Sequence, residues 1–317
     1  MRLPALAFFT VLLPSVCAFA QQEDSLSIQK NKRILDSLDT FFTHQDSLDI
    51  FDLIDSLLKA EAVRDRSQLA VRIGYNSNIV ADNRTFNINQ FGLAPGISYY
   101  HKSGAYLDYT AYWSQEYDPH LYLSVASGGY LHSFSKGYSM LAEYSHYFYN
   151  QPSDSTVSVP YTNNVGVSNY FNIKSFVGRL DYYFYFGEKS AHRIMPNVGF
   201  NFIKRKWHKL ERISFYPNAG IMFGTEEITN YSPAPNLLFR IVYNRTHTPK
   251  LPLVIENRYT EFGVMNYSFS APITVATKHW FFLLNYTYNI PKALPGENLS
   301  LENSGYISFS ITRYIGL

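Results

Sequence analysis

Histidines are the side chains of this sequence best suited to bind a metal or carry a proton, and there are nine of them. They stand singly, and no two lie two or four residues apart, the spacing that brings two rings to one face of a strand or helix. Because a metal site needs several converging ligands, we expect no metal. Gly128 and Gly129 lie within a strand pattern and indicate a close-packed sheet rather than a phosphate loop, so we expect no cofactor.

Two places bring a nucleophile or an acid close to a histidine. Ser103 follows His101 by two residues, and Asp118 precedes His120 by two. A serine nucleophile needs a base within hydrogen-bond reach and a third group that orients this base. Ser103 and Gly104 are also ordinary turn residues, and an exposed polar loop accounts for Asp118 and His120. We therefore expect no catalytic residue at either place.

Charged residues that share one face of the predicted strands form a more informative set. These candidate interior residues are Arg72, Asp108, Glu143, Arg179 and Asp181. Both signs occur, and charges enclosed by protein must pair or stay hydrated. We interpret the set as a pairing ladder that fills and stiffens the interior of the fold. A selectivity filter is the alternative, although a filter favours one sign.

The segments that carry these residues alternate with a period of two from Ser67 onward, as β-strands do. One face is aliphatic and aromatic, and the other is small or polar. The pattern is clearest in residues 69–75, 107–113, 176–186, 213–223, 282–289 and 307–315. An apolar outer wall around a polar lumen is typical of a transmembrane β-barrel, which makes the five charged residues candidates to line the lumen.

The composition agrees with a barrel. Aromatic residues make up 17% of the chain and charged residues only 16%, whereas a soluble domain has about 25% charged residues. No apolar run after residue 20 is long enough for a membrane helix, but in a barrel only every second residue has to face lipid. A secreted β-sandwich is the alternative. The net charge of +2 indicates no nucleic-acid partner.

The first twenty residues predict a secretory signal peptide. Arg2 precedes an apolar run, and Ala18, Phe19 and Ala20 form a small-x-small cleavage site. Cleavage after Ala20 leaves 317 − 20 = 297 residues and removes Cys17, the only cysteine, so the mature chain has no disulfide or thiolate chemistry. A lipoprotein would retain Cys17, but such signals need a small residue where Val16 stands.

Residues 21–66 differ from the rest of the chain. The triplet Asp-Ser-Leu recurs four times, at Asp24, Asp36, Asp46 and Asp55, and each Asp-Ser pair is suited to cap the start of a helix. Apolar residues then follow at helical spacing. We predict a short periplasmic amphipathic helical leader that serves as a spacer at the barrel mouth; binding of a partner or self-association is the alternative.

The breaks between strands alternate in length, and this orients the barrel. The short breaks are 101–104, 133–137, 173–174, 207–211 and 276–279. The long ones are 76–90, 116–119, 150–162, 187–193, 225–260 and 291–303, of which 116–119 is the one poor fit. Barrels of this class have short periplasmic turns, long outer loops and an even number of strands. About thirteen segments alternate, so we assign residues 236–245 to the outer loop, which leaves twelve strands; fourteen is the alternative. We expect this segment to pack as a short helix or hairpin over or into the barrel mouth; another strand there is the alternative.

The final strand has a function of its own. The segment from Ser304 to Leu317 alternates cleanly and ends in aromatic and apolar residues. Such a strand predicts recognition by the barrel-assembly machinery, the expected partner together with outer-membrane lipid, although it ends in Leu rather than Phe. Arg313 has the lipid-facing parity, which costs only about 0–1 kcal/mol near an interface.

The signal peptide, the leader and the strands occur together with three aromatic and proline-containing segments, 92–101, 215–220 and 285–291. In these features the chain resembles a family of uncharacterised outer-membrane β-barrel proteins of Gram-negative bacteria, which implies a barrel in the bacterial outer membrane and no catalytic residue. His101 and Ser103 are similar to the His-x-Ser of outer-membrane phospholipase A, but they lie in a predicted periplasmic turn, far from the outer interface. TonB-dependent receptors, with a plug and about 22 strands, need a longer chain.

The sequence therefore predicts an all-β transmembrane antiparallel barrel of about 12 strands with a short α-helical leader. The signal peptide occupies residues 1–20, the leader 21–66 and the barrel 67–317. We expect a non-enzymatic protein, either a small-solute channel or a structural and surface-binding barrel. A hydrolase acting on lipid or peptide is the alternative.

Overall fold

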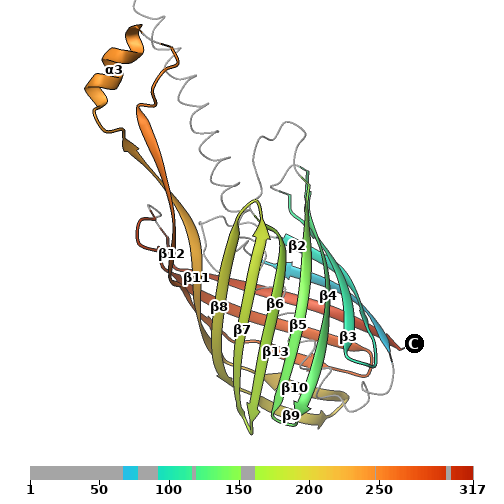
Figure 1. Ribbon diagram of the computed structural model, residues 1–317. Helices are drawn as coiled ribbons and strands as arrows, with labels where there is room; N and C mark the ends of the chain where they lie inside the picture. The colour runs from blue at the N-terminus through green and yellow to red at the C-terminus, as the bar shows by residue number, and fades with distance from the viewer. Residues whose placement is uncertain are drawn as a thin grey trace, which may run out of the picture.

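The structure, a computed structural model, describes residues 67–77, 92–115, 119–150, 161–246, 248–297 and 301–316. In these residues fifteen β-strands form one antiparallel sheet (Figure 1). Twelve of them make up the barrel: β1 (Gln68–Asn76), β2 (Gly92–Tyr100), β3 (Ala105–Trp113), β4 (Leu121–Ser135), β5 (Tyr138–Tyr149), β6 (Tyr161–Ile173), β7 (Phe176–Gly187), β8 (Ser190–Phe200), β11 (Asn218–Pro233), β12 (Val254–Ser270), β14 (Trp280–Pro291) and β15 (Ser304–Gly316).

Two pairings complete the closed ring of strands. Strand β1 pairs with β15 along its whole length, from Gln68↔Gly316 to Asn76↔Ser308. Strand β12 pairs with β14 between residues 266–270 and 287–291. A closed sheet has no free edge and satisfies its backbone hydrogen bonds internally, which is what lipid requires of a spanning sheet. The twelve-strand barrel is confirmed, and the β-sandwich is excluded.

Three shorter strands continue barrel strands at the end that carries the short turns. Strands β9 (Phe202–Trp207), β10 (Leu210–Phe215) and β13 (Ile273–Ala276) extend β8, β11 and β12. The breaks fall at Asn201, Pro217 and Pro272, and a proline removes a ladder donor. Beyond them β10 pairs with β9 and β13. Short turns mark the periplasmic end of such barrels, so the β9–β10 hairpin lies on the periplasmic side.

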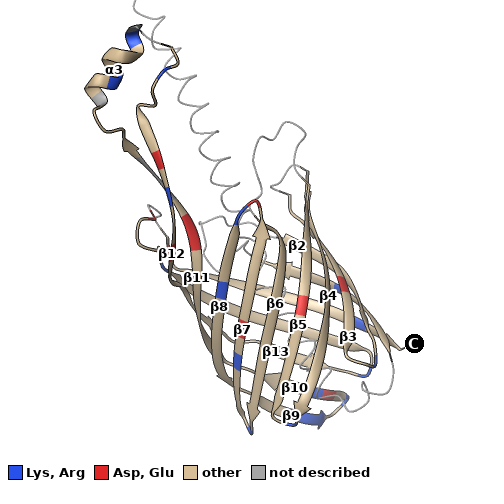
Figure 2. Ribbon diagram, in the orientation of Figure 1, with Lys and Arg blue, Asp and Glu red and all other residues tan. Residues whose placement is uncertain are grey.

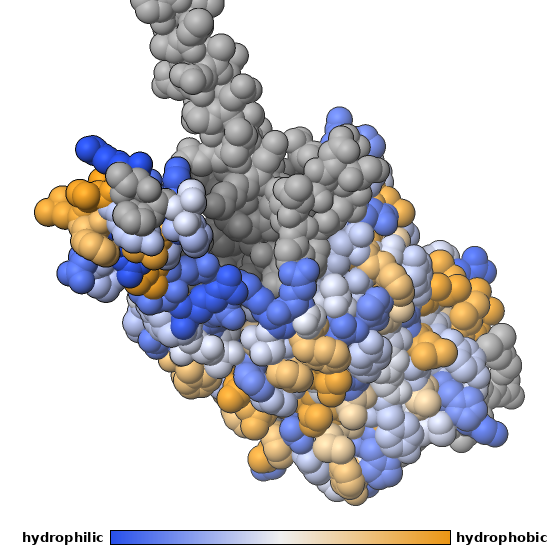
Figure 3. All heavy atoms as spheres, turned by 45° about the horizontal axis from the view of Figure 1, so that its top comes forward, coloured by the Kyte–Doolittle hydropathy of each residue, from blue (hydrophilic) through white to orange (hydrophobic). Residues whose placement is uncertain are grey.

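The two faces of the wall carry opposite kinds of side chain. Large apolar residues such as Val71, Leu107 and Leu180 face outward and are exposed, whereas the inward face is buried and mostly Ser, Thr, Asn and Tyr. Apolar side chains are accordingly spread over the outer wall (Figure 3). Hydrocarbon is the solvent that covers such a wall favourably. Among the described residues, no helix has the length and apolar character to cross a membrane.

The interior of the barrel is packed with side chains near both ends. At the periplasmic end Tyr100, Tyr106 and Phe281 belong to one buried cluster. Towards the outer end Tyr183 and Met265 belong to a second, and Tyr112 lies in a third. Each of these residues is at most 8% exposed, so the described interior is a core of interlocking side chains.

Two predicted outer loops differ from the structure. The break at 187–193 was expected to be long, but β7 and β8 pair up to Phe186↔Ser190 and leave a tight turn. The segment 225–260 is mostly strand, because β11 and β12 continue to Pro233 and from Val254. Between them lies one helix, α3 (Leu237–Thr246), which confirms the short helix. The signal peptide and the leader lie outside the described residues.

Candidate functional site

Arg72 is the first of the predicted lumen residues, and its side chain crosses a whole strand. Its Nη2 atom donates to Thr110 Oγ1 on β3 at 2.7 Å and lies 3.6 Å from Asp108 Oδ2. Gly96 of β2 stands between them in the register. A Cβ at this position would lie 2.9 Å from the threonine oxygen and 3.2 Å from the arginine nitrogen. The contact therefore depends on glycine, which lets a long side chain lie flat on the wall.

Asp108, the second predicted residue, contacts three side chains. It accepts hydrogen bonds from Ser98 Oγ and, at 2.8 Å, from Thr110 Oγ1. Thr110 thus accepts from Arg72 and donates to Asp108, so a relay of polar contacts joins β1, β2 and β3. Asp108 and Arg72 are each 6% exposed. This buried ion pair, whose carboxylate also accepts from two hydroxyl groups, holds three strands of the wall together.

Glu143 on β5 also contacts a side chain that crosses an intervening strand. The hydroxyl of Tyr106 on β3 donates to its carboxylate, and the phenol ring crosses β4 over Gly129, which pairs with both residues. A Cβ on Gly129 would lie 2.6 Å from Tyr106 Cε1. The close packing predicted at Gly128 and Gly129 thus has a specific reason at Gly129, namely the passage of a tyrosine.

Arg179 and Asp181 pair within one strand. Both lie on the inward side of β7, and Arg179 Nε is 2.8 Å from Asp181 Oδ1. The guanidinium also lies 5.5 Å from the centre of the Tyr170 ring on β6. All five predicted residues therefore lie inside the wall and are buried. They do not meet at one point, but form two ion pairs and one carboxylate held by a phenol.

The two candidate catalytic places look different in the structure. His101 Nδ1 lies 2.8 Å from Ser103 Oγ and also accepts from the Ser103 backbone N–H at 3.2 Å. Both residues are exposed in the β2–β3 turn, and such a contact between i and i+2 closes a turn. Asp118 lies outside the described residues, and His120 lies against the ring of Trp113. In the part of the chain that the structure describes, no three His, Cys, Asp or Glu residues group as metal ligands.

A feature that the sequence did not reveal is a two-stranded ribbon above the barrel, which we call the arm (residues 225–260). Pairing of β11 with β8 ends at Gly224↔Arg193, and pairing of β12 with β14 ends at Asn266↔Pro291. The two strands nevertheless stay paired up to Pro233↔Val254. Because β8 begins at Ser190, level with residue 227 of β11, only residues 228–233 extend past the wall. At about 3.3 Å per residue they carry the ribbon about 20 Å beyond it. Figure 1 shows this ribbon above the barrel.

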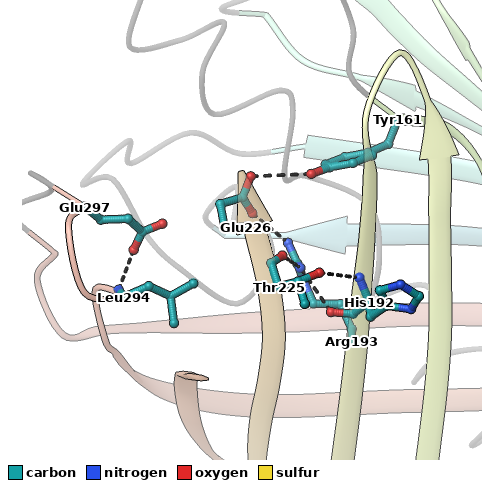
Figure 4. A network of polar contacts seen from close by, with 7 residues as sticks. All are labelled: Tyr161, His192, Arg193, Thr225, Glu226, Leu294 and Glu297. Carbon is teal, nitrogen blue, oxygen red and sulfur yellow. Dashed lines mark hydrogen bonds and ion pairs between the residues drawn. The ribbon is translucent and has the colours of Figure 1, made fainter. Parts of the chain in front are cut away.

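Buried contacts fasten the base of the arm to the barrel rim (Figure 4). Arg193 of β8 lies 3.0 Å from Glu226 Oε2 and donates to the carbonyl of Thr225 at 2.5 Å. The backbone N–H of His192 donates to Thr225 Oγ1 at 2.8 Å, and Tyr161 OH donates to Glu226 Oε1 at 3.4 Å. The Arg193 side chain is only 3% exposed. The arm therefore leaves the barrel from a fixed base.

At the tip of the arm, α3 turns its polar residues inward. Arg240 donates to the carbonyls of Pro235 at 3.0 Å and Pro252 at 2.9 Å. Asn244 exchanges two hydrogen bonds with the backbone of Leu251, at 2.7 and 2.8 Å. These bonds use the polar side of the helix to hold the returning loop.

The apolar side of α3 consequently faces away from its own loop. Leu238 is 80% exposed, Phe239 62%, Val242 63% and Ile241 36%. The prediction that this segment packs over the barrel mouth is wrong, because the ribbon holds it away from the barrel and its polar side takes the inner contacts (Figures 1 and 3).

Comparisons with known proteins find similarity only among solved structures. No protein-family model matches the chain, and neither does any curated protein. Among solved structures, a KdgM porin matches at 8% identity and a TM-score of 0.41, covering 78% of this chain and 98% of its own. LpxR from Salmonella typhimurium matches at 10% identity and a TM-score of 0.38, covering 78% of this chain and 99% of its own. OmpT of Vibrio cholerae matches at 9% identity and a TM-score of 0.32, covering 78% of this chain and 97% of its own.

The location of the protein follows from its own wall. A closed antiparallel barrel with an apolar outer surface, a polar inner surface and short turns at one end is the form that proteins of the bacterial outer membrane take. The chain is an outer-membrane β-barrel.

Proposed function

We propose that the protein is a non-enzymatic surface-binding barrel, which holds the arm outside the cell so that the apolar side of α3 meets a partner. The observation that carries the proposal is the orientation of α3. A helix that merely filled a loop would turn its apolar side inward, whereas this one bonds inward through Arg240 and Asn244. Exposed apolar patches rimmed by polar residues mark interaction sites.

The strength of such binding can be bounded. Full burial of one aliphatic or aromatic side chain contributes about 1.5–3 kcal/mol, so the four exposed apolar residues of α3 contribute at most about 12 kcal/mol. Association itself costs about 4–15 kcal/mol. The helix alone therefore supports only weak binding, and a stable partner has to contact more of the arm. The outer edges of the ribbon, on β11 after Gly224 and on β12 before Asn266, offer backbone groups to which a partner strand can pair.

The described interior and turns favour a role without catalysis. The five lumen charges are bonded to one another or to hydroxyl groups, and His101 and Ser103 close an exposed turn. Neither place presents a nucleophile and an oriented base to a bound molecule. The alternative of a hydrolase acting on lipid or peptide gains no support from these residues.

Site-specific photo-cross-linking in intact cells tests the proposal. A photoreactive residue at position 238 or 242 is expected to give a discrete adduct of higher mass. The matched control is position 189, which is exposed in the β7–β8 turn at the same end of the barrel but off the arm. Adducts that are equally strong at 189, or none at 238 and 242, would contradict a binding role for α3.

A small-solute channel is the second candidate. It is favoured by the inward positions of β14 and β15, which hold only Asn, Thr and Ser over much of their length: Asn285, Thr287, Asn289, Ser308, Ser310 and Thr312. A polar wall of short side chains is suited to a narrow aqueous path. Refolded protein in a planar bilayer separates the candidates, because regular conductance steps would favour the channel and a silent bilayer the packed interior.

A further inference from the structure

The periplasmic end of the barrel carries a strong excess of positive charge. Four basic residues lie on β9 and β10, and Arg313 lies near the end of β15. Each of the five turns at this end also holds one lysine: Lys102, Lys136, Lys174, Lys209 and Lys278. We call these ten residues the basic rim; part of it is visible as the blue β9–β10 hairpin in Figure 2. Nine of the ten are exposed, and Glu211 is the one acidic side chain that the described residues place at this end.

The outer end is different. Its described residues hold seven basic and seven acidic side chains, and several of them pair, as Lys189 does with Glu227 at 3.7 Å. With histidine neutral, the formal charge there is 7 − 7 = 0, against 10 − 1 = +9 at the periplasmic end. Like charges gathered on one ring repel one another unless a counter-charge approaches. The asymmetry indicates an anionic partner on the periplasmic side.

Arg313 lies on the lipid-facing side of the wall. Residues directly opposite each other on paired strands share a face, and the register partners of Arg313 are Val71 and Trp280, which are 46% and 41% exposed. The guanidinium lies 5.4 Å from the centre of the Trp280 ring. Tryptophan rings lie at the level of lipid headgroups, and the planar fork of an arginine matches the oxygens of a phosphate. Arg313 is therefore placed to bind a lipid phosphate.

Aromatic side chains lie beside the turn lysines. The ring of Tyr138 stacks on those of Phe134 and Phe171, at 5.2 Å between ring centres in both pairs. These residues flank the turns that hold Lys136 and Lys174. An aromatic girdle marks the boundary between hydrocarbon and headgroups, and the apolar stem of a lysine can cross such a surface and bring its ammonium group into the headgroup layer. The turn lysines therefore reach the level of lipid phosphates around the barrel.

We propose that the basic rim binds the headgroups of anionic phospholipids in the periplasmic leaflet of the membrane. One site consists of Arg313 on Trp280, and Lys278 in the adjoining turn supplies a second cation. A ring of cations spread over every turn matches the ring of lipid that surrounds a barrel, whereas a soluble acidic protein would contact only one sector of it. This surface lies at the opposite end of the barrel from α3, so it is independent of the role proposed for the arm.

Quenching of tryptophan fluorescence by brominated lipid tests the proposal in the folded full-length protein. The chain has three tryptophans, of which Trp280 lies at the basic rim and Trp113 at the outer end of β3. A chain with Trp113→Phe and Trp207→Phe reports on the rim through Trp280 alone. Vesicles that mix phosphatidylcholine with phosphatidylglycerol, either one brominated, give the binding constant of the anionic lipid relative to the zwitterionic lipid. We expect a preference for the anionic lipid of about 5- to 30-fold at low salt, the factor that one or two cations provide at an anionic surface.

Charge variants identify the contact. Arg313→Gln together with Lys278→Gln should abolish the preference at Trp280. The matched control, Lys189→Gln with Lys292→Gln, removes two exposed cations from the outer end and should leave the preference intact. Salt at 1 M, which shortens the screening length to about 3 Å, should lower the preference in the chain with an unaltered rim. This salt measurement decides the question if the double variant does not fold.

Trp113 provides the second comparison. A chain with Trp207→Phe and Trp280→Phe reports on the outer end, where the formal charges balance, and should show no preference. The proposal is overturned by the absence of a preference at Trp280, by an equal preference at Trp113, or by a preference that the double variant retains. Binding of soluble poly-glutamate to the rim without a lipid preference would assign the rim to a soluble acidic partner, and would overturn the proposal as well.

Discussion

Gly128 and Gly129 are adjacent in β4 and face opposite sides of the wall. Replacing each in turn by alanine therefore isolates the energetic cost of disturbing the contact between Gly129 and the Tyr106 ring on the inner side. A Cβ on Gly129 would lie 2.6 Å from Tyr106 Cε1 and 2.6 Å from the carbonyl oxygen of Ala142. A Cβ on Gly128 would lie 3.1 Å from Leu107 Cδ2, the flexible end of a side chain, and 3.7 Å from a carbonyl oxygen. Gly129→Ala must therefore displace the tyrosine, whereas Gly128→Ala asks only for a small shift of a leucine.

The magnitude follows from what the tyrosine holds. Its displacement breaks the hydrogen bond to Glu143, and a bond to a charged group contributes about 1.5–3 kcal/mol. Overpacking adds about 1–3 kcal/mol, part of which the ring relieves by moving. The gain of about 0.4–1 kcal/mol from restricting the unfolded chain is common to both variants. We expect Gly129→Ala to lower the free energy of unfolding by about 2–4 kcal/mol, and Gly128→Ala by less than about 1 kcal/mol.

Urea unfolding of the barrel in lipid vesicles, followed by tryptophan fluorescence, measures both values. Tyr106→Phe removes the same hydrogen bond without overpacking, and it provides the second side of a double-mutant cycle. Because Gly129→Ala and Tyr106→Phe act on one contact, their effects should be clearly less than additive. Equal destabilisation by the two glycine variants, or full additivity in the cycle, would show that Gly129 does not make room for the contact between Tyr106 and Glu143.

Leu180→Arg places a charge on the lipid side of β7, which costs about 2–4 kcal/mol near mid-membrane. It should reduce the refolding yield more than Val177→Arg, because Val177 faces inward. Equal yields would show that the two faces are misassigned. Arg193→Met removes the buried partner of Glu226 and should speed tryptic cleavage of the arm severalfold. Lys189→Met breaks only an exposed ion pair, which contributes little, and should leave the cleavage rate unchanged. Identical rates in both variants would mean that Arg193 does not hold the arm. Because the closed sheet has no edge, folded protein in unboiled SDS should migrate differently from boiled protein on a gel, and identical migration would count against the barrel.

Much of the fold could be predicted from local sequence alone. The period of two identified the strands, and parity separated the lipid face from the inner face, because successive side chains of a strand point to opposite sides. Arg179 and Asp181, two residues apart on one strand, could be expected to meet. The even strand number then identified residues 236–245 as the segment that does not span the membrane, and the structure places α3 there.

Contacts across strands could not be predicted, because they depend on the register, and a shift of one residue changes every partner. Arg72 meets Asp108, and Tyr106 meets Glu143, only because Gly96 and Gly129 fall in the intervening strands at those levels. The alternation of side chains around Arg72 and Asp108 shows which face of the wall these residues occupy, but not which residues they contact.

The arm shows the same limit on a larger scale. The pattern of residues 225–260 indicates neither where β8 and β14 stop pairing nor that β11 and β12 continue as a ribbon. Side-chain alternation reports the two faces of a strand, whereas its edges are filled by backbone groups that are alike in every residue. The sequence by itself determined a closed barrel with an apolar wall, and the tertiary structure alone decided which strands outrun it and which way α3 faces.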